Sequence, residues 1–255
     1  MKHLPDQTRL RVASYNIRKA RGLDQRRNPT RILAVINHLG ADVVALQEAD
    51  RRFGDRPSAL CRGLIERETD FQVADLAPNE VSLGWHGNAI LIRKGMRSTD
   101  AKRIDLPGLE PRGAVSIQLN TVDPLVIVGT HLGLTRYHRR KQLRTITNGF
   151  GSSDHAVIVG DFNEWSPSVG LEPITERFDV HAPGRTYHAA QPLAALDRIA
   201  VTYGLQLCAS GVEDGPLARR ASDHLPIWAD IAVSPGRAAI SNTEPAALHC
   251  AADRG

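Results

Sequence analysis

The feature that most constrains the fold is a series of short, β-branched apolar runs along the chain. Runs of this length, bounded by glycine, proline and polar residues, are typical of buried β-strands. Many of the connections between them are too short for a helical crossover, which argues against a doubly wound parallel sheet and favours a mixed α+β arrangement of packed sheets. The predicted strands are residues 10–15, 43–46, 89–92, 115–119, 125–128, 156–159, 199–201 and 227–231.

Three helices are predicted between these strands. The first covers residues 29–39, where Asn28 can cap the N-terminus and Pro29 suits the first helical position. The second covers residues 58–67 and the third residues 135–150. No internal repeat is visible.

Length and composition set the domain organisation. At 255 residues, with 42% apolar and 24% charged residues, the chain can bury one sizeable core. We expect a lead-in at residues 1–8 and a single domain at residues 9–233. The tail at residues 234–255 is rich in Ala, Pro and Gly without periodicity, and it is expected to be disordered.

The apolar runs, the cysteine count and the net charge limit where the protein is expected to be located and what it is expected to bind. No apolar run approaches the roughly 18 residues of a transmembrane helix, and the N-terminus lacks the apolar centre of a secretory signal, so a cytoplasmic protein is expected. Three well-separated cysteines offer neither a disulfide framework nor a zinc cluster. A net charge of +4 fits an anionic partner without selecting nucleic acid over a smaller phosphorylated molecule. The oligomeric state is left open, and a monomer fits.

The chemical signal is that apolar runs repeatedly meet an oxygen- or imidazole-bearing side chain at their ends. Burying an unpaired charge is costly, so such groups need partners, and the simplest shared partner is a metal ion. For any one residue a loop cap or a surface salt bridge is the better explanation; six such sites together reverse that preference. The residues are Asn16, Glu48, His131, Asp161 with Asn163, Asp197 with Arg198, and Asp223 with His224.

The donor types predict which metal. Carboxylates and a carboxamide, without a thiolate cluster, suit a hard cation, so Mg²⁺ is expected and Mn²⁺ is possible. Magnesium would also keep water molecules, one of which could be a reactant.

Six segments resemble those of the endonuclease/exonuclease/phosphatase superfamily, in the same order: VASYNI, ALQEAD, GTHL, GDFN, LDRI and SDHLPI. The match spans residues 10–232 and is most similar to short bacterial members. The resemblance implies a DNase I-like four-layer α/β sandwich, with two mixed β-sheets packed face to face, helices outside, and an active site at one end.

The resemblance also implies roles for the strand-end residues. Glu48 would be the main metal carboxylate, with Asn16 and Asp223 near the cation or its waters. Asp161 would orient or deprotonate the attacking water, or protonate the leaving oxygen, and the sequence does not choose between these. Asn163 would donate its amide to a phosphate oxygen.

Two histidines are expected to meet the developing negative charge. Asp197 would fix the tautomer of His224 and favour its imidazolium form. His131 would be a second donor to the phosphate or to the leaving group; its alternative is a strand-end histidine bonded to backbone.

Weaker candidates would contact the substrate. Arg112 and Asn88 stand at strand entrances, although a solvated arginine is nearly as good an explanation for Arg112. Arg198 and Tyr187 complete this set, and Tyr187 could stack on a base or sugar together with Trp165. Basic residues that could steer a polyanion, or could simply be solvated, are Arg18, Lys19, Arg21, Arg136, Arg140 and Arg144.

The leading functional hypothesis is a metal-dependent phosphoesterase that hydrolyses a phosphodiester by in-line attack of water, first of all a nuclease. The alternative is a phospholipid, phosphoinositide or other small-molecule phosphodiesterase or phosphatase. A non-catalytic anion-binding module is disfavoured, because all the expected catalytic positions hold competent residue types.

Overall fold

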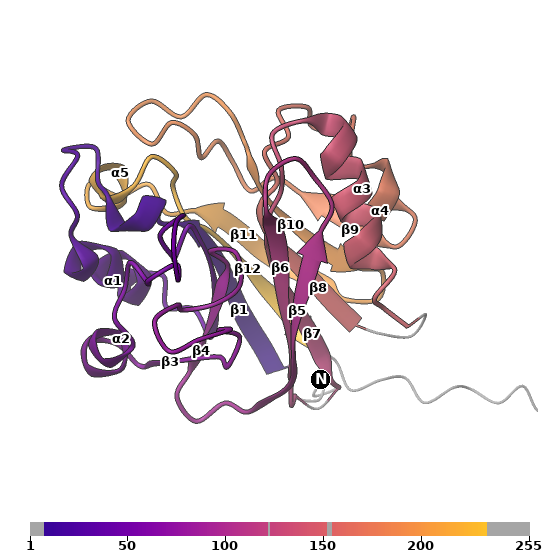
Figure 1. Cartoon of the computed structure of the whole chain (residues 1–255). Coiled ribbons are helices and arrows are strands. Elements are labelled where there is room, and N and C mark those ends of the chain that lie inside the picture. Colours follow the sequence, from indigo (N-terminus) through magenta and orange to yellow (C-terminus); the bar gives the residue numbers. More distant parts are fainter. Residues whose placement is uncertain (1–7, 122, 152–154, 234–255) are drawn as a thin grey trace, which may run out of the picture.

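The computed structural model describes residues 8–121, 123–151 and 155–233, and it contains two six-stranded mixed sheets (Figure 1). In the first sheet β1 and β2 are parallel neighbours and every other pairing is antiparallel. Its order is β11 (Gln206–Val212), β12 (Ile227–Val233), β1 (Thr8–Asn16), β2 (Val43–Gln47), β4 (Ala89–Arg93) and β3 (Phe71–Val73).

The second sheet repeats this plan, since β7 and β8 are its parallel pair and its other pairings are antiparallel. Its order is β5 (Ser98–Leu106), β6 (Arg112–Leu119), β7 (Leu125–His131), β8 (His155–Asp161), β10 (Asp197–Thr202) and β9 (Phe178–His181). The two central parallel pairs therefore occupy equivalent third and fourth places.

Helices cover the outer face of each sheet. The helices α1 (Pro29–His38), α2 (Arg62–Glu68) and α5 (Ala218–Ala221) pack on the first sheet. The helices α3 (Arg136–Thr147) and α4 (Glu172–Thr175) pack on the second. The predicted four-layer sandwich is confirmed.

Strand periodicity explains the layers. In β1, Val12 faces the core between the sheets, while Ala13 and Tyr15 face the helices. Central strands are buried on both faces and consequently read as continuous apolar runs, as in β2, where all five residues are buried. These continuous runs are the ones that the sequence reveals most clearly.

The second predicted helix begins later than expected. It was predicted over residues 58–67, but α2 starts at Arg62. The reason is that Ser58 and Ala59 donate their backbone N–H groups to the carbonyl oxygens of Val81 and Ala49, which ties them to neighbouring loops.

Two predictions concern the chain ends and the membrane. The expected disordered tail at 234–255, and the lead-in except residue 8, lie outside the described residues. Among the helices that the structure describes, none is both long and apolar enough to cross a bilayer.

Candidate active site

The site lies where the carboxyl ends of the two parallel pairs meet. In the first sheet Asn16 ends β1 and pairs with Gln47, the residue before Glu48. In the second sheet the register sets Asp161 opposite His131 on one side and opposite Asp197 on the other. Three residues predicted to act together thus form a single row across the adjacent strands β7, β8 and β10. They are His131, Asp161 and Asp197.

Asp161 is the centre of a buried polar cluster. Its Oδ2 atom accepts a hydrogen bond from Asn16 Nδ2 at 3.1 Å and lies 3.4 Å from His131 Nε2 and 3.5 Å from His224 Nε2. Its side chain is only 2% exposed. Residues from both sheets therefore converge on one carboxylate oxygen.

His224 is held between two carboxylates. Its Nδ1 atom lies 2.9 Å from Asp197 Oδ2, which also accepts a 2.6 Å hydrogen bond from the Thr186 hydroxyl. Burial alone would lower the pKa of His224, but the negative charges of Asp197 and Asp161 outweigh it and raise that pKa to about 10. This pKa keeps His224 an imidazolium at neutral pH.

The pKa of His131 is shifted in the opposite direction. Burial lowers its pKa to about 3, and nearby Arg112 acts in the same direction, although Asp161 opposes both. The site therefore pairs one neutral and one charged histidine on the same aspartate.

Asn163 follows β8 in a left-handed conformation, with φ at 51°. Its backbone N–H donates to Asp161 Oδ1 at 3.0 Å, and its Nδ2 donates to the Leu132 carbonyl oxygen at 2.9 Å. One amide hydrogen is thus used inside the protein, which leaves the other for a ligand.

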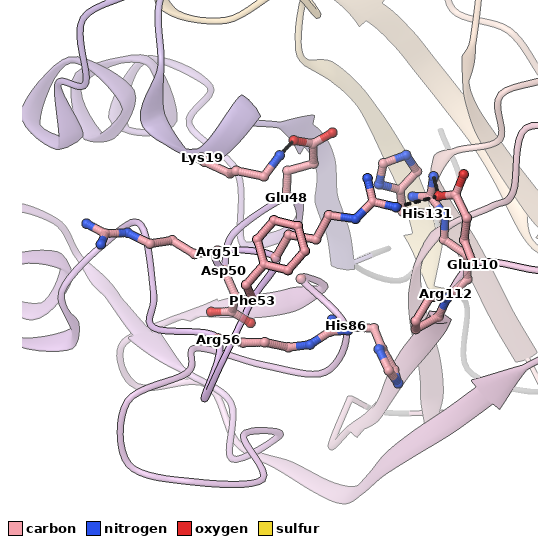
Figure 2. A pocket seen from close by; sticks show the side chains of 13 residues that line it. Lys19, Glu48, Asp50, Arg51, Phe53, Arg56, His86, Glu110, Arg112 and His131 are labelled. Carbon is pink, nitrogen blue, oxygen red and sulfur yellow. Dashed lines mark hydrogen bonds and ion pairs between the residues drawn. The ribbon is translucent and has the colours of Figure 1, made fainter.

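Glu48 and Asp223 face cations supplied by the chain itself. A turn of left-handed residues, η1 (Arg18–Ala20), follows β1 and turns two basic side chains toward these carboxylates. Lys19 forms an ion pair with Glu48, visible in Figure 2, and Arg18 Nε lies 3.2 Å from Asp223 Oδ2. The sequence predicted that both basic residues either steer a polyanion or are simply solvated, and it did not predict these pairs.

The oxygen donors of this group fit a hard divalent cation. Both carboxylates remain partly exposed, at 27% for Glu48 and 20% for Asp223, and their present partners are flexible side chains that can move aside. Asn16 is the weaker ligand, because its Oδ1 already accepts the Arg18 backbone N–H at 3.1 Å.

A second metal-binding arrangement competes with this one. The ligand atoms of Asp161, Asp197 and His224 lie within 4.8 Å of one another and could hold an ion. Within this group, His224 Nδ1 already lies 2.9 Å from Asp197 Oδ2. The described residues therefore offer two candidate places for a divalent cation, one at Glu48 and Asp223 and one at Asp161, Asp197 and His224.

Two predicted substrate contacts are not supported by the geometry. Asn88 is fully buried and donates to the carbonyl oxygens of Gly113 and Trp85, so it joins loops inside the fold. Arg198 is 2% exposed, and its guanidinium donates to the carbonyl oxygens of Asp197 and Glu164. Both side chains bond internal backbone, while Asn88 Oδ1 and Arg198 Nε are buried without a hydrogen-bond partner among the described residues.

The other two candidates lie beside the cluster. Arg112 lines a pocket with Glu48 and His131, and its guanidinium lies 3.1 Å from Glu110. The Tyr187 ring centroid is 5.0 Å from that of His224, and the exposed Trp165 meets Tyr187 edge-on at 6.5 Å. These rings could border a bound substrate.

Sequence reasoning also missed a buried ion-pair group behind the site. Glu164 pairs with Arg139 at 2.6 Å and with Arg136 at 2.9 Å. Arg140 lies 3.7 Å from Glu172. Two of the α3 arginines that could steer a polyanion, Arg136 and Arg140, therefore face carboxylates. In the sequence, the one sign of this ion-pair group is the acidic residue three positions after Asp161.

Fold and site together define a two-sheet sandwich with a carboxylate–histidine centre, an arrangement suited to phosphoester hydrolysis. The model of the Endonuclease/Exonuclease/phosphatase family matches residues 13–224, and the chain belongs to that family. Members of this family are phosphoester hydrolases that generally depend on a divalent metal, so the chain is an enzyme of this class.

The similarity to other proteins covers nearly the whole chain. Uncharacterized protein YbhP of Escherichia coli strain K12 is 28% identical, over 89% of this chain and 99% of that protein. The structure of D. rerio TDP2 with a single-strand DNA product has a TM-score of 0.68 and 16% identity, covering 89% of this chain and 100% of that one. A mannosyl-6-phosphatase of Bacteroides thetaiotaomicron has a TM-score of 0.69 and 16% identity, covering 88% and 100%. At these identities the two structures show the shared fold alone.

Proposed function

We propose that the chain hydrolyses a phosphodiester by in-line attack of water, with Mg²⁺ or Mn²⁺ bound at Glu48 and Asp223. The observation that carries the proposal is the convergence of Asn16, His131 and His224 on one oxygen of Asp161. Such a carboxylate is positioned by fixed donors before a substrate arrives, which is the condition for efficient proton transfer and charge stabilisation.

Different residues of the chain would carry out proton transfer and charge stabilisation. Asp161 holds the attacking water and accepts its proton. The His224 imidazolium faces the phosphate as negative charge grows, and Asp197 keeps it charged and oriented. A bound divalent ion would polarise the phosphoryl oxygens and lower the pKa of water.

The direct test is hydrolysis of bis(p-nitrophenyl) phosphate by the wild type with Mg²⁺ or Mn²⁺. Glu48→Gln should remove most of the activity and weaken binding of Mn²⁺ in calorimetry. Glu66→Gln, at an exposed glutamate on α2, is the matched control and should change neither. Full activity in Glu48→Gln would exclude this metal assignment.

Nucleic acid is the first substrate class that we propose to examine. Its support is the Tyr187 ring beside His224 and the Trp165 ring that contacts Tyr187, since base stacking contributes about 1–3 kcal/mol per base. Single-stranded DNA, supercoiled DNA and RNA should therefore be compared with small phosphoesters. Turnover of small esters alone would favour a phosphatase or a small-molecule phosphodiesterase.

A further inference from the structure

A basic pocket adjoins the catalytic residues on the side of the first sheet. It has a volume of about 400 Å³ and shares Glu48 and His131 with the site described above. Its other walls come from the loop at residues 50–56 and from the segment that leads into β6 (Figure 2). The pocket therefore opens beside the position where a phosphodiester would be cleaved.

Positive charge is in excess in this pocket. Its lining includes five lysine and arginine residues and three acidic residues, although the Arg51 guanidinium extends away from the other lining side chains in Figure 2. Glu110 is shared, because its Oε2 atom lies 3.4 Å from Arg52 Nη2 and 3.1 Å from Arg112 Nη2. One carboxylate therefore holds two guanidinium groups near each other while offsetting only one charge.

Further donors in the pocket have no partner. The Arg56 guanidinium makes no hydrogen bond or ion pair with any residue that the structure describes, and in Figure 2 it extends toward His86. Within the same described residues, Arg112 Nε is buried without a hydrogen-bond partner. Buried donors without partners are uncommon in native structures, and they are satisfied when an anion binds.

The loop that carries Arg52 and Arg56 is held in place by hydrogen bonds to backbone groups. Ala59 N–H donates to the Ala49 carbonyl oxygen at 2.7 Å and closes the loop at its base. The buried Asp50 carboxylate accepts the backbone N–H groups of Leu83 at 2.7 Å and Gly84 at 3.3 Å. The pocket is thus formed before a ligand binds, which lowers the entropy that binding must overcome.

We propose that this pocket is a second anion subsite, and that it binds a phosphate group of the substrate other than the one that is hydrolysed. Arg52, Arg56 and Arg112 are its ligand residues, because guanidinium groups bind phosphate oxygens in pairs. The exposed Phe53 ring lines the same pocket and would contact the apolar part of the bound molecule. The inference rests on the proposed function and specifies a substrate that carries two phosphate groups.

The first test measures binding without turnover. Inorganic pyrophosphate is titrated into the protein by calorimetry in the presence of a metal chelator. Arg56→Gln should weaken the affinity on the order of tenfold, the loss of about one charge-assisted contact. Arg97→Gln, at an exposed arginine between β4 and β5 at the opposite end of the sheet, should leave the affinity unchanged. Equal affinities in wild type and Arg56→Gln would overturn the subsite.

The second test uses a pair of substrates that differ by one phosphate. Thymidine 5′-(p-nitrophenyl phosphate) is compared with the same compound carrying a 3′-phosphate. The wild type should show the lower KM for the phosphorylated compound, and Arg56→Gln or Arg52→Gln should lose this preference. An unchanged preference in both variants would contradict the proposal.

A parallel pair built on glycerol distinguishes the sources of the second phosphate. A preference in the nucleotide pair alone identifies a nucleic-acid backbone, and a preference in both pairs identifies any substrate with two phosphates. Absence of turnover with every compound would refute the proposed hydrolysis, while the pyrophosphate titration would still decide the subsite.

Discussion

The two sheets follow the same strand order, yet their central parallel pairs end in different surroundings. In the second sheet Asp161 ends β8 beside Asp197, the first residue of the neighbouring strand β10, and these side chains are 2% and 0% exposed and are oriented by fixed donors. The first sheet leads to Glu48, which is 27% exposed and forms an ion pair with the ammonium of Lys19, itself 33% exposed. The same backbone plan thus supports a rigid, water-poor half and an open half in which cations can be exchanged.

We propose that this difference gives the two halves separate tasks. A buried carboxylate surrounded by fixed donors suits proton transfer, because little has to reorganise when charge develops. An exposed carboxylate beside a flexible cation suits reversible binding of a metal ion, because the competing ion pair is weak. The following experiments test this division, from the largest expected effect to the smallest.

Asp161→Asn should have the largest effect. The change keeps the size of the side chain but removes the charge and the proton acceptor, so activity should fall about 10³-fold. The rate with bis(p-nitrophenyl) phosphate measures the loss, and Asp75→Asn, at an exposed aspartate, is the control. A loss of less than tenfold would mean that the buried half is not the proton-transfer half.

Glu164→Gln tests whether the buried half depends on its supporting ion pairs. The substitution leaves the buried Arg139 without a charged partner, and the free energy of unfolding should fall by about 3 kcal/mol. Urea denaturation provides the measurement. The control is Glu176→Gln, at an exposed position, where a change within about 0.5 kcal/mol is expected.

The same pair predicts a dependence of stability on pH. Burial would raise the pKa of Glu164, but hydrogen bonds from Arg136, Arg139 and the Ser166 backbone outweigh it and lower that pKa to about 2. In the unfolded chain the value is ~4.3, so the stabilisation is complete above this pH and is lost as the pH falls toward 2.

Denaturation at pH 5 and pH 3 should therefore show a smaller gap between wild type and Glu164→Gln at the lower pH. A gap that widens on acidification would contradict the assignment of this ion pair.

Lys19→Gln should have the smallest effect, and it tests the open half. The exposed ion pair with Glu48 is worth about 0.2–1 kcal/mol, so its removal should tighten binding of Mn²⁺ by no more than about fivefold. Calorimetry is the measurement, and Lys102→Gln on the exposed strand β5 is the control. Weaker binding in Lys19→Gln would show that the ammonium and the metal do not compete for Glu48.

The sequence predicted the central strands well and the edge strands poorly. The four strands that were not predicted, β3, β5, β9 and β11, are the outermost strands of the two sheets. An edge strand buries less surface and can carry polar residues, as β5 does with Lys102 and Arg103. Its apolar pattern is therefore too weak to separate it from a loop.

For the site, the sequence predicts which residues stand at strand ends, but it does not predict the hydrogen-bond and ion-pair partners of their side chains. A polar residue at the end of an apolar run predicts its place at the sheet edge, as with Asp161 and Asp197. Whether a side chain points to solvent or inward depends on long-range contacts, so Asn88 and Arg198 were taken for substrate contacts although they bond internal carbonyl groups. The pairing of Lys19 with Glu48 likewise depends on a turn of left-handed residues.

The row of His131, Asp161 and Asp197 is fixed by strand register, whereas the loop with Arg52 and Arg56 closes on its own base through Ala49 and Ala59. The residues proposed to carry out the reaction and those proposed to bind the second phosphate can consequently change independently of each other during evolution. A lineage could lengthen, shorten or replace that loop and acquire a new substrate in few steps, without rebuilding the reactive centre. The same junction is the natural place to graft a loop when this scaffold is engineered.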